Sequence, residues 1–259
     1  MKNTQKNELA VCGLEAVRAL VAENPQKVTR FYYTEERIKY FGDFFKTLAK
    51  QKIPYNKVEN PLELEKICGS VHHQGVVAMI KQPKIEPLST EVTDEWLHNK
   101  ESALLLDRVG NANNLGAIVR SAAFFGFKNI VIPLDESQTS ITTSSYRVAQ
   151  GGMEYVKIYT VRSMEKLLRS MSKKMFRVGT DVNAKTPVTK IKSLAKNKPL
   201  IIVLGNEEHG ISDETKRNCD ELVIIPYGSN ASNRQIRRIE SLNVAQAAAI
   251  VLFAATSLD

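Results

Sequence analysis

Apolar positions in the first 80 residues follow two different periods. Stretches whose apolar residues lie three or four positions apart predict helices, and short runs rich in apolar and aromatic residues predict strands. In chain order these elements are a helix at 13–23, a strand at 30–33, a helix at 36–51, a strand at 55–58, a helix at 62–68 and a strand at 76–80. Such an alternation predicts a small α/β module.

After residue 100 the pattern changes to short, mostly apolar runs that are separated by helical or loop segments. Six of these runs predict strands, at 103–106, 130–132, 156–159, 177–179, 200–204 and 222–225. Strands that are apolar on both faces are typical of a parallel sheet that is covered by helices on each side. We therefore expect a second, larger α/β domain.

The stretch between these two parts shows no apolar periodicity. Residues 81–96 contain two prolines and several serines and threonines, a composition that is typical of a linker. We therefore expect a domain at 1–82, a linker at 83–100 and a second domain at 101–259.

The composition is that of an ordinary globular protein. The chain has 259 residues, of which 43% are hydrophobic, with 36 Lys and Arg against 28 Asp and Glu, for a net charge of +8. These values exclude collagen-like, low-complexity and disordered classes. The basic excess is compatible with a nucleic-acid partner, although many basic proteins bind no nucleic acid.

Cysteine usage and hydropathy indicate a soluble, cytoplasmic protein. Cys12, Cys68 and Cys219 are widely spaced, without a CxxC pair or a flanking histidine cluster, which indicates reduced thiols and no zinc or other metal site. The N-terminus lacks the apolar core of a signal peptide, and the longest apolar run, 247–255, is too short to span a bilayer. We expect no membrane partner.

The first stretch with candidate chemistry is 104–127, which predicts a strand, a polar turn and a helix. Asn113 or Asn114 is expected to cap that helix, leaving its first amide groups open toward the edge of the sheet. Arg120 could project toward the same edge. The turn lacks GxGxxG, which argues against a nicotinamide-binding Rossmann site, and the alternative is a capped helix with a solvated arginine.

Two further stretches place polar residues directly after apolar strands. In 199–212 the strand runs into a loop that begins at Gly205 and ends near Gly210, and paired glycines permit positive φ and close approach of a ligand. In 221–255 the strand ends at Pro226, and Ser241-Leu242-Asn243 opens a helix so apolar that we expect it to be buried. The alternatives are a tight turn and an ordinary helix cap.

The order and spacing of these stretches resemble the three motifs of the SpoU (TrmH) family of ribose 2′-O-methyltransferases. The matching positions are Asn114, Gly116 and Arg120 in the first motif, Gly205, Glu207 and Gly210 in the second, and Ile225, Pro226 and Ser241 to Val244 in the third; Gly151 and Glu154 also fit. Residues 13–17 and 73–78 resemble the family's substrate-binding domain, which is related in fold to kink-turn-binding ribosomal proteins.

The resemblance implies an α/β architecture with a deep trefoil knot in the C-terminal parallel-sheet domain, the SPOUT fold, after a small RNA-binding domain. It also implies a homodimer with the active site at the dimer interface. S-adenosyl-L-methionine is the implied cofactor, bound in the knot. The implied reaction is 2′-O-ribose methylation of a structured tRNA or rRNA, without a metal.

The resemblance also implies roles for individual residues. Catalysis is expected from Asn114, Arg120, Ser241 and Asn243. Cofactor binding is expected from Leu204, Gly205, Glu207, Gly210, Ile225, Pro226, Leu242 and Asn243. A guanidinium stays protonated in proteins, so we expect Arg120 to stabilise the developing alkoxide rather than to act as the base.

The sequence departs from the family pattern at three places. Asn111-Ala112 replaces the usual Asp-Pro before the first motif, and residues 149–152 replace a Ser-x-Gly-Ala string. The loop 227–240 is longer than usual, and its three arginines, Arg234, Arg237 and Arg238, are expected to contact RNA phosphates. The alternative is an ordinary mobile surface loop whose charges are only solvated.

Two other functions are compatible with parts of the pattern. One is an RNA-binding protein on the same scaffold with little or no methyl transfer, and the other is a nucleotide-binding α/β enzyme of another class. The second predicts a phosphate loop that this chain lacks. Retention of Asn114, Arg120, Glu207, Ser241 and Asn243 favours an active methyltransferase over the first.

Overall fold

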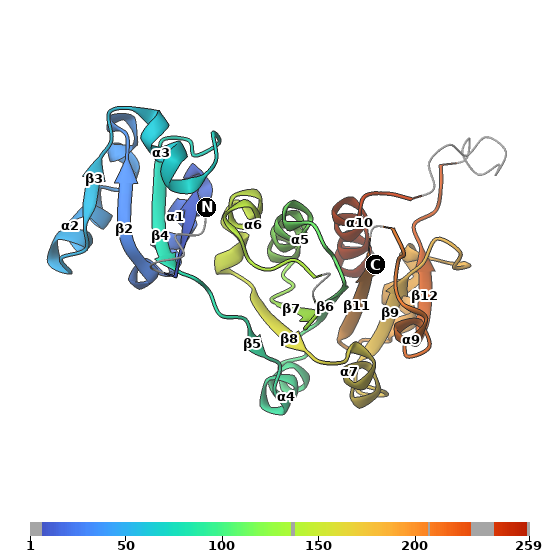
Figure 1. The fold of residues 1–259 in the computed structure, drawn as a ribbon. Helices are drawn as coiled ribbons and strands as arrows, with labels where there is room; N and C mark the ends of the chain where they lie inside the picture. The colour runs from blue at the N-terminus through green and yellow to red at the C-terminus, as the bar shows by residue number, and fades with distance from the viewer. Residues whose placement is uncertain (1–6, 136–137, 207, 229–240, 258–259) are drawn as a thin grey trace. The chain divides into compact units, whose positions relative to one another are not determined.

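A computed structural model of the chain describes residues 7–135, 138–206, 208–228 and 241–257. These residues divide into two compact units, each with its own sheet (Figure 1). Unit 1 combines the chain up to residue 84 with residues 140–155, and unit 2 combines 85–139 with the chain from 156 onward. The division differs from the expected one because a segment from the middle of the chain belongs to the first unit.

Unit 1 contains a four-stranded sheet with the order β1-β4-β2-β3. Its strands are β1 (Glu8–Cys12), β2 (Val28–Tyr33), β3 (Tyr55–Lys57) and β4 (Val76–Lys81). Strand β4 runs antiparallel to β1 and β2, whereas β2 and β3 are parallel. The α/β character matches the prediction, but β1 was not predicted, although residues 9–12 form a short apolar run.

The helices of unit 1 include those predicted at 13–23 and 62–68, whereas the one predicted at 36–51 is divided and three others were not predicted. They are α1 (Leu14–Glu23), η1 (Pro25–Lys27), η2 (Glu35–Tyr40), α2 (Gly42–Lys50), α3 (Pro61–Cys68), α6 (Thr143–Ala149) and η3 (Gly152–Glu154). The single helix expected at 36–51 is a 3₁₀ turn followed by α2. Phe41, which is only 2% exposed, lies between them.

Residues 140–155 are fixed to unit 1 by a buried carboxylate and a glycine. The Glu154 side chain is 1% exposed, and its Oε2 accepts hydrogen bonds from Asn24 Nδ2 at 2.6 Å and Lys27 Nζ at 2.9 Å. Gly151 has a φ of +96°, and a Cβ built there would lie 2.6 Å from Ala19 Cβ on α1. The structure therefore gives Gly151 and Glu154, which fit the family pattern, a docking role.

Unit 2 is built on an eight-stranded, all-parallel sheet with the order β10-β12-β9-β11-β6-β7-β8-β5. The strands are β5 (Glu86–Pro87), β6 (Ala103–Asp107), β7 (Asn129–Pro133), β8 (Lys157–Val161), β9 (Phe176–Thr180), β10 (Thr186–Pro187), β11 (Leu200–Gly205) and β12 (Glu221–Ile224). The predicted parallel sheet is confirmed, and all six predicted strands are present.

The helices of unit 2 connect the strands of this sheet and cover it. They are α4 (Thr90–His98), α5 (Ala112–Phe124), α7 (Met164–Ser170), η4 (Val188–Lys190), α8 (Ile191–Ala195), α9 (Asp213–Lys216) and α10 (Val244–Ser257). Helix α10 packs against α5, so the last described helix contacts the helix that carries the first motif (Figure 1).

The expectation of a linker at 83–100 is wrong. Strand β5 pairs with β8 at the edge of the sheet, and α4 buries Trp96 in the core of unit 2. The Trp96 ring is 2% exposed and meets the Tyr159 ring edge-on at 5.9 Å between centroids. The prolines therefore lie around a short edge strand, and the segment is part of unit 2.

The expectation that α10 is buried holds for only one face of the helix in a single subunit. One face packs inward through Ala248, Val251 and Leu252, but Ile250 is 38% and Phe253 48% exposed. No helix in the described residues is long and apolar enough to cross a bilayer. The expected knot depends on the path of the chain before α10, which includes residues outside the described ones, and it stays a prediction.

Candidate functional site

The first motif follows β6, whose five residues are all buried. The chain turns at Arg108, which has a φ of +62°, and α5 then begins with a cap from Asn111. The Asn111 Oδ1 accepts hydrogen bonds from the backbone N–H of Asn113 at 2.8 Å and of Asn114 at 3.4 Å. The cap is therefore Asn111, one of the residues that depart from the family pattern, and not Asn113 or Asn114 as predicted.

A buried carboxylate joins the end of β6 to the second motif. Asp107 is 4% exposed; its Oδ1 accepts a hydrogen bond from Arg108 Nε at 2.9 Å, and its Oδ2 accepts one from the Ser212 backbone N–H at 2.9 Å. Sequence reasoning did not single out Asp107. The signal that could have found it is a carboxylate at the end of an otherwise apolar strand, where a charge needs partners.

The second motif is a tight loop at the carboxyl end of β11. Asn206 and Gly210 exchange backbone hydrogen bonds of 3.1 and 2.9 Å, and the Asn206 Nδ2 donates to the Arg108 carbonyl oxygen at 2.9 Å. The loop returns so closely that a Cβ on Gly205 would lie 2.2 Å from the Gly210 carbonyl carbon. The sequence analysis expected a ligand to approach the Gly205 backbone closely, but the atoms that do so are backbone atoms of Gly210 and Ile211.

Gly210 has the positive φ that the sequence analysis expected for this loop. Its φ of +65° lies in the left-handed region, and a Cβ built there has no described atom within 4 Å. This face of the loop is therefore open, which suits the close approach of a ligand to backbone groups. Glu207 lies outside the described residues, and its role stays a prediction.

The third motif meets the first in a direct side-chain contact. The Asn243 Nδ2 donates a hydrogen bond to the Asn114 Oδ1 at 3.1 Å, across 129 positions of sequence. The Asn243 Oδ1 also accepts a hydrogen bond from the Ala245 N–H at 2.9 Å, so Asn243 caps α10. The structure thus joins two of the four predicted catalytic residues.

Arg120 lies elsewhere on α5. Six positions separate it from Asn114, about 9 Å along a helix axis. Its side chain is exposed on the same face as Phe124, four positions further on, which is 82% exposed. Within the described part of the chain Arg120 makes no ion pair, and no hydrogen bond joins it to Asn114 or Asn243.

The expected cofactor residues meet at one edge of the sheet. Leu204 and Gly205 end β11, and Ile225 and Pro226 follow β12. Parallel strands end at a common edge, where open α/β sheets bind their ligands. Leu242, 45% exposed, adds an apolar side chain beside the start of α10. Apolar side chains next to open backbone groups fit an adenosyl group.

The roles of Ser241 and of the three arginines of the 227–240 loop stay predictions. Ser241 is exposed and makes no hydrogen bond to another described residue. Arg234, Arg237 and Arg238 lie outside the described residues. Within the described ranges, no three His, Cys, Asp or Glu side chains gather as a metal site would require.

Two protein families match the chain. The SpoU rRNA Methylase family matches residues 101–253, and the family described as RNA 2′-O ribose methyltransferase substrate binding matches residues 10–86. This chain belongs to the SpoU rRNA methylase family. It is an S-adenosylmethionine-dependent RNA 2′-O-methyltransferase, as the motifs predicted.

Individual relatives and one solved structure agree with this family membership. The 23S rRNA (guanosine-2′-O-)-methyltransferase RlmB of Acinetobacter baylyi is 32% identical over 94% of both chains. An uncharacterized tRNA/rRNA methyltransferase of Haemophilus influenzae is 31% identical over 69% of this chain, which spans about half (49%) of that relative. The AviRb methyltransferase of Streptomyces viridochromogenes, solved with AdoMet, has the same fold, with a TM-score of 0.72 and 23% identity over 98% of this chain and 91% of AviRb.

The two hydrogen bonds of Asn243 in this methyltransferase can be separated by substitution. Asn243→Ala removes both the contact with Asn114 and the cap of α10, so we expect a loss of about 1–2 kcal/mol in stability as well as lower activity. Asn243→Asp keeps a capping oxygen but loses the amide donor. We therefore expect nearly native thermal stability and reduced methyl transfer. Equal stability losses in the two variants would contradict the capping role.

Proposed function

We propose that this methyltransferase modifies the 2′-hydroxyl of a guanosine in 23S rRNA. The proposal is supported by the similarity to the 23S rRNA (guanosine-2′-O-)-methyltransferase RlmB of Acinetobacter baylyi. This similarity covers 94% of the chain and therefore extends over both units. In this proposal the N-terminal module, residues 1–82, binds the RNA and the remaining domain transfers the methyl group. The proposal includes the cytoplasm as the place of the reaction, which agrees with the reduced thiols that the cysteine spacing indicates.

The chemistry needs a positioned ribose oxygen and a stabilised negative charge. Bound S-adenosylmethionine supplies an electrophilic methyl group. The ribose oxygen would have to lose its proton and lie in line with that methyl group, so orientation contributes much of the rate. The Asn114–Asn243 pair presents amide groups that can orient the ribose. The Arg120 guanidinium stabilises the developing alkoxide and holds the adjacent phosphate.

We assign the exposed face of α5 and α10 to a homodimer interface. Phe124, Ile250 and Phe253 are exposed there although they are large and apolar, and the Phe253 ring lies 6.4 Å from that of Phe125. Exposed apolar patches of this kind favour a protein partner. Arg120 shares this face, and in this proposal it acts beside the Asn114–Asn243 pair of the second copy. The dimer thereby completes a site that one subunit leaves without its arginine.

A charge placed in this face should separate the subunits. We expect Phe124→Glu to sediment as a monomer and to lose methyl transfer, because a buried, unpaired carboxylate opposes association. Val182→Glu is the matched control, since Val182 is an exposed apolar residue of unit 2 outside this face. Sedimentation velocity measures the result. A Phe124→Glu protein that stays dimeric would exclude this interface.

The substrate is tested with RNA from cells that lack the gene. The purified protein and labelled S-adenosylmethionine are incubated with 23S rRNA, 16S rRNA and tRNA from those cells, and 2′-O-methylated positions are mapped. We expect label at a guanosine of 23S rRNA and none in 23S rRNA from cells that have the gene. Label in tRNA would move the substrate to tRNA, and no label in any RNA would favour the RNA-binding alternative.

A further inference from the structure

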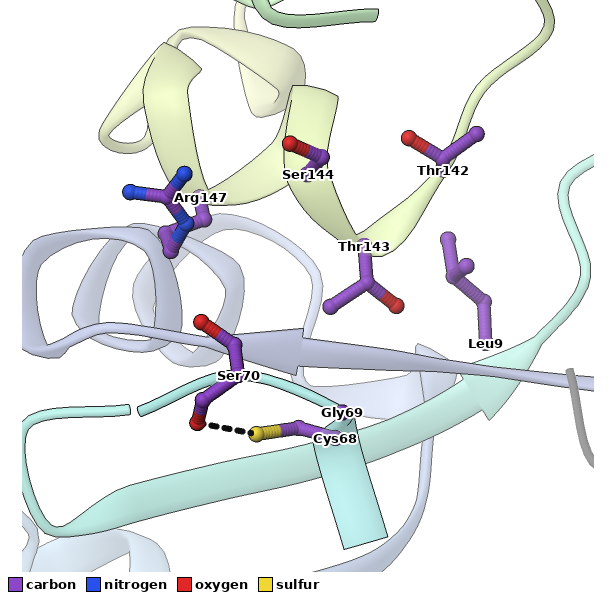
Figure 2. Close-up of a pocket in the computed structure, with 8 residues that line it drawn as sticks. All are labelled: Leu9, Cys68, Gly69, Ser70, Thr142, Thr143, Ser144 and Arg147. Atoms are coloured by element: carbon purple, nitrogen blue, oxygen red, sulfur yellow. Dashed lines mark hydrogen bonds between the residues drawn. The ribbon is translucent and has the colours of Figure 1, made fainter. Parts of the chain in front are cut away.

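Unit 1 contains a pocket outside the methyl-transfer site. It has a volume of about 310 Å³ and lies between the 68–70 turn and the start of α6 (Figure 2). Leu9 of β1 forms part of its wall. This volume is at the lower end of the range for small-molecule sites in proteins. The pocket is therefore large enough for part of a nucleotide.

The pocket is lined by polar side chains that can donate hydrogen bonds. Its side chains include four hydroxyls, those of Ser70, Thr142, Thr143 and Ser144, and the guanidinium of Arg147. None of the eight lining residues has a carboxylate. Hydroxyl and guanidinium groups together donate hydrogen bonds to an oxyanion, and the guanidinium fits a phosphate with two parallel bonds.

Arg147 is half-buried, and the residues that the structure describes give it no counter-ion. It makes no salt bridge or hydrogen bond to another residue in the described ranges. Its aliphatic part is held beside Gly13, where a Cβ would lie 3.7 Å from Arg147 Cγ. A cation that is partly removed from water without a partner is unfavourable, and an anion in the pocket offsets this cost.

The other wall of the pocket is a turn fixed by its own contacts. The Cys68 Sγ donates a hydrogen bond to the Ser70 carbonyl oxygen at 3.3 Å, and the Ser70 Oγ accepts one from the His72 N–H at 3.2 Å. Figure 2 shows Ser70 and Thr143 on the two sides of the pocket. The hydroxyls thus come from two segments that unit 1 already holds together.

We propose that this pocket binds a phosphate group of the RNA substrate, with Arg147 as its charged ligand. The inference rests on the proposed function, since it takes RNA as the substrate. The turn at 68–70 lies within the part of the chain that matches the RNA substrate-binding family. The pocket therefore positions the RNA backbone through contacts that carry no base specificity.

Substitution of Arg147 tests the charge contact. Arg147→Gln should weaken binding of the rRNA substrate about tenfold and should lower the slope of log K against log salt by roughly 0.7–0.9, one phosphate contact. Arg147→Lys should restore the slope and part of the affinity. Lys46→Gln is the control, because it removes an exposed charge from α2, beside β3 at the other edge of the same sheet, and should leave the slope near the wild-type value. Affinity for S-adenosylmethionine should not change in any variant.

Thr143→Val tests the hydroxyl side without altering charge. We expect a smaller loss of RNA affinity with an unchanged salt slope and native thermal stability. Wild-type affinity and wild-type salt slope in both Arg147→Gln and Thr143→Val would overturn the proposal. Because the wild-type protein is assayed for methyl transfer on the same RNA, failure of the proposed function appears separately, as a wild-type protein that neither binds nor methylates that RNA.

A second measurement distinguishes RNA from a free anion. The amide resonances of Ser70 and Thr143 are followed in the full-length protein during titration with an RNA fragment or with inorganic phosphate. We expect shifts with RNA at much lower concentrations than with phosphate, and their loss in Arg147→Gln. If inorganic phosphate saturated the shifts and RNA caused none, the pocket would bind a free anion and the RNA contact would be overturned. If neither probe shifted these resonances, the pocket would not be a phosphate site.

Discussion

Replacement of Arg120 by alanine should lower the single-turnover rate of methyl transfer by about 100- to 1,000-fold, the effect of removing one group that stabilises an oxyanion. Affinity for S-adenosylmethionine and thermal stability should stay at the wild-type level. The reason is that Arg120 is exposed and pairs with no other described residue. Single-turnover kinetics with rRNA and calorimetry with the cofactor measure the two quantities.

Two further variants make this result specific. Arg120→Lys keeps the charge but loses the planar fork, so we expect little recovery of the rate. Arg217→Ala removes another exposed arginine of unit 2, at the end of α9, and should leave the rate unchanged. A near-native rate in Arg120→Ala, with the dimer intact by sedimentation, would remove Arg120 from the chemistry and strengthen the RNA-binding alternative.

Gly205→Ala should abolish S-adenosylmethionine binding and destabilise unit 2. The added Cβ would lie 2.2 Å from the Gly210 carbonyl carbon and 2.3 Å from the Ile211 nitrogen, both backbone atoms. The loop 206–210 must therefore move away from β11, at a cost of about 3 kcal/mol. Thermal unfolding should begin roughly 10 °C lower, and calorimetry should show no cofactor binding.

The control for this variant is Gly42→Ala. Gly42 lies at the start of α2, and a Cβ there has no described atom within 4 Å. Alanine favours helix more than glycine does, so this substitution should leave stability equal or slightly higher. If Gly205→Ala bound the cofactor with wild-type affinity, the second motif would tolerate displacement, and its assignment to the cofactor would be wrong.

The sheet of unit 2 could be predicted because its central strands are apolar on both faces. Strands β6 and β11, for example, are buried along their whole length, and each leaves a continuous apolar run in the sequence. The two-residue strands β5 and β10 leave no such run. Trp96 is buried by the tertiary packing of α4, although the surrounding composition is that of a linker.

The candidate site was only partly accessible from the sequence. Family motifs indicated Asn114 and Asn243, and the structure adds the hydrogen bond between them. Asp107 and Asn206 were not singled out, because their value comes from partners about 100 positions away. Similarly, only the folded chain shows that Glu154 pairs with Asn24 and Lys27.

The docking of Glu154 into unit 1 has a consequence for synthesis on the ribosome. Asn24 and Glu154 are separated by 130 positions, so the N-terminal module is made long before the carboxylate that Asn24 binds. At a translation rate of about 5–20 residues per second, synthesis of these 130 residues takes roughly 7 to 26 s. Until then, the surface of α1 that receives Gly151 is uncovered. The nascent module therefore reaches its native form only after β6, α5 and β7 of the other unit have been translated.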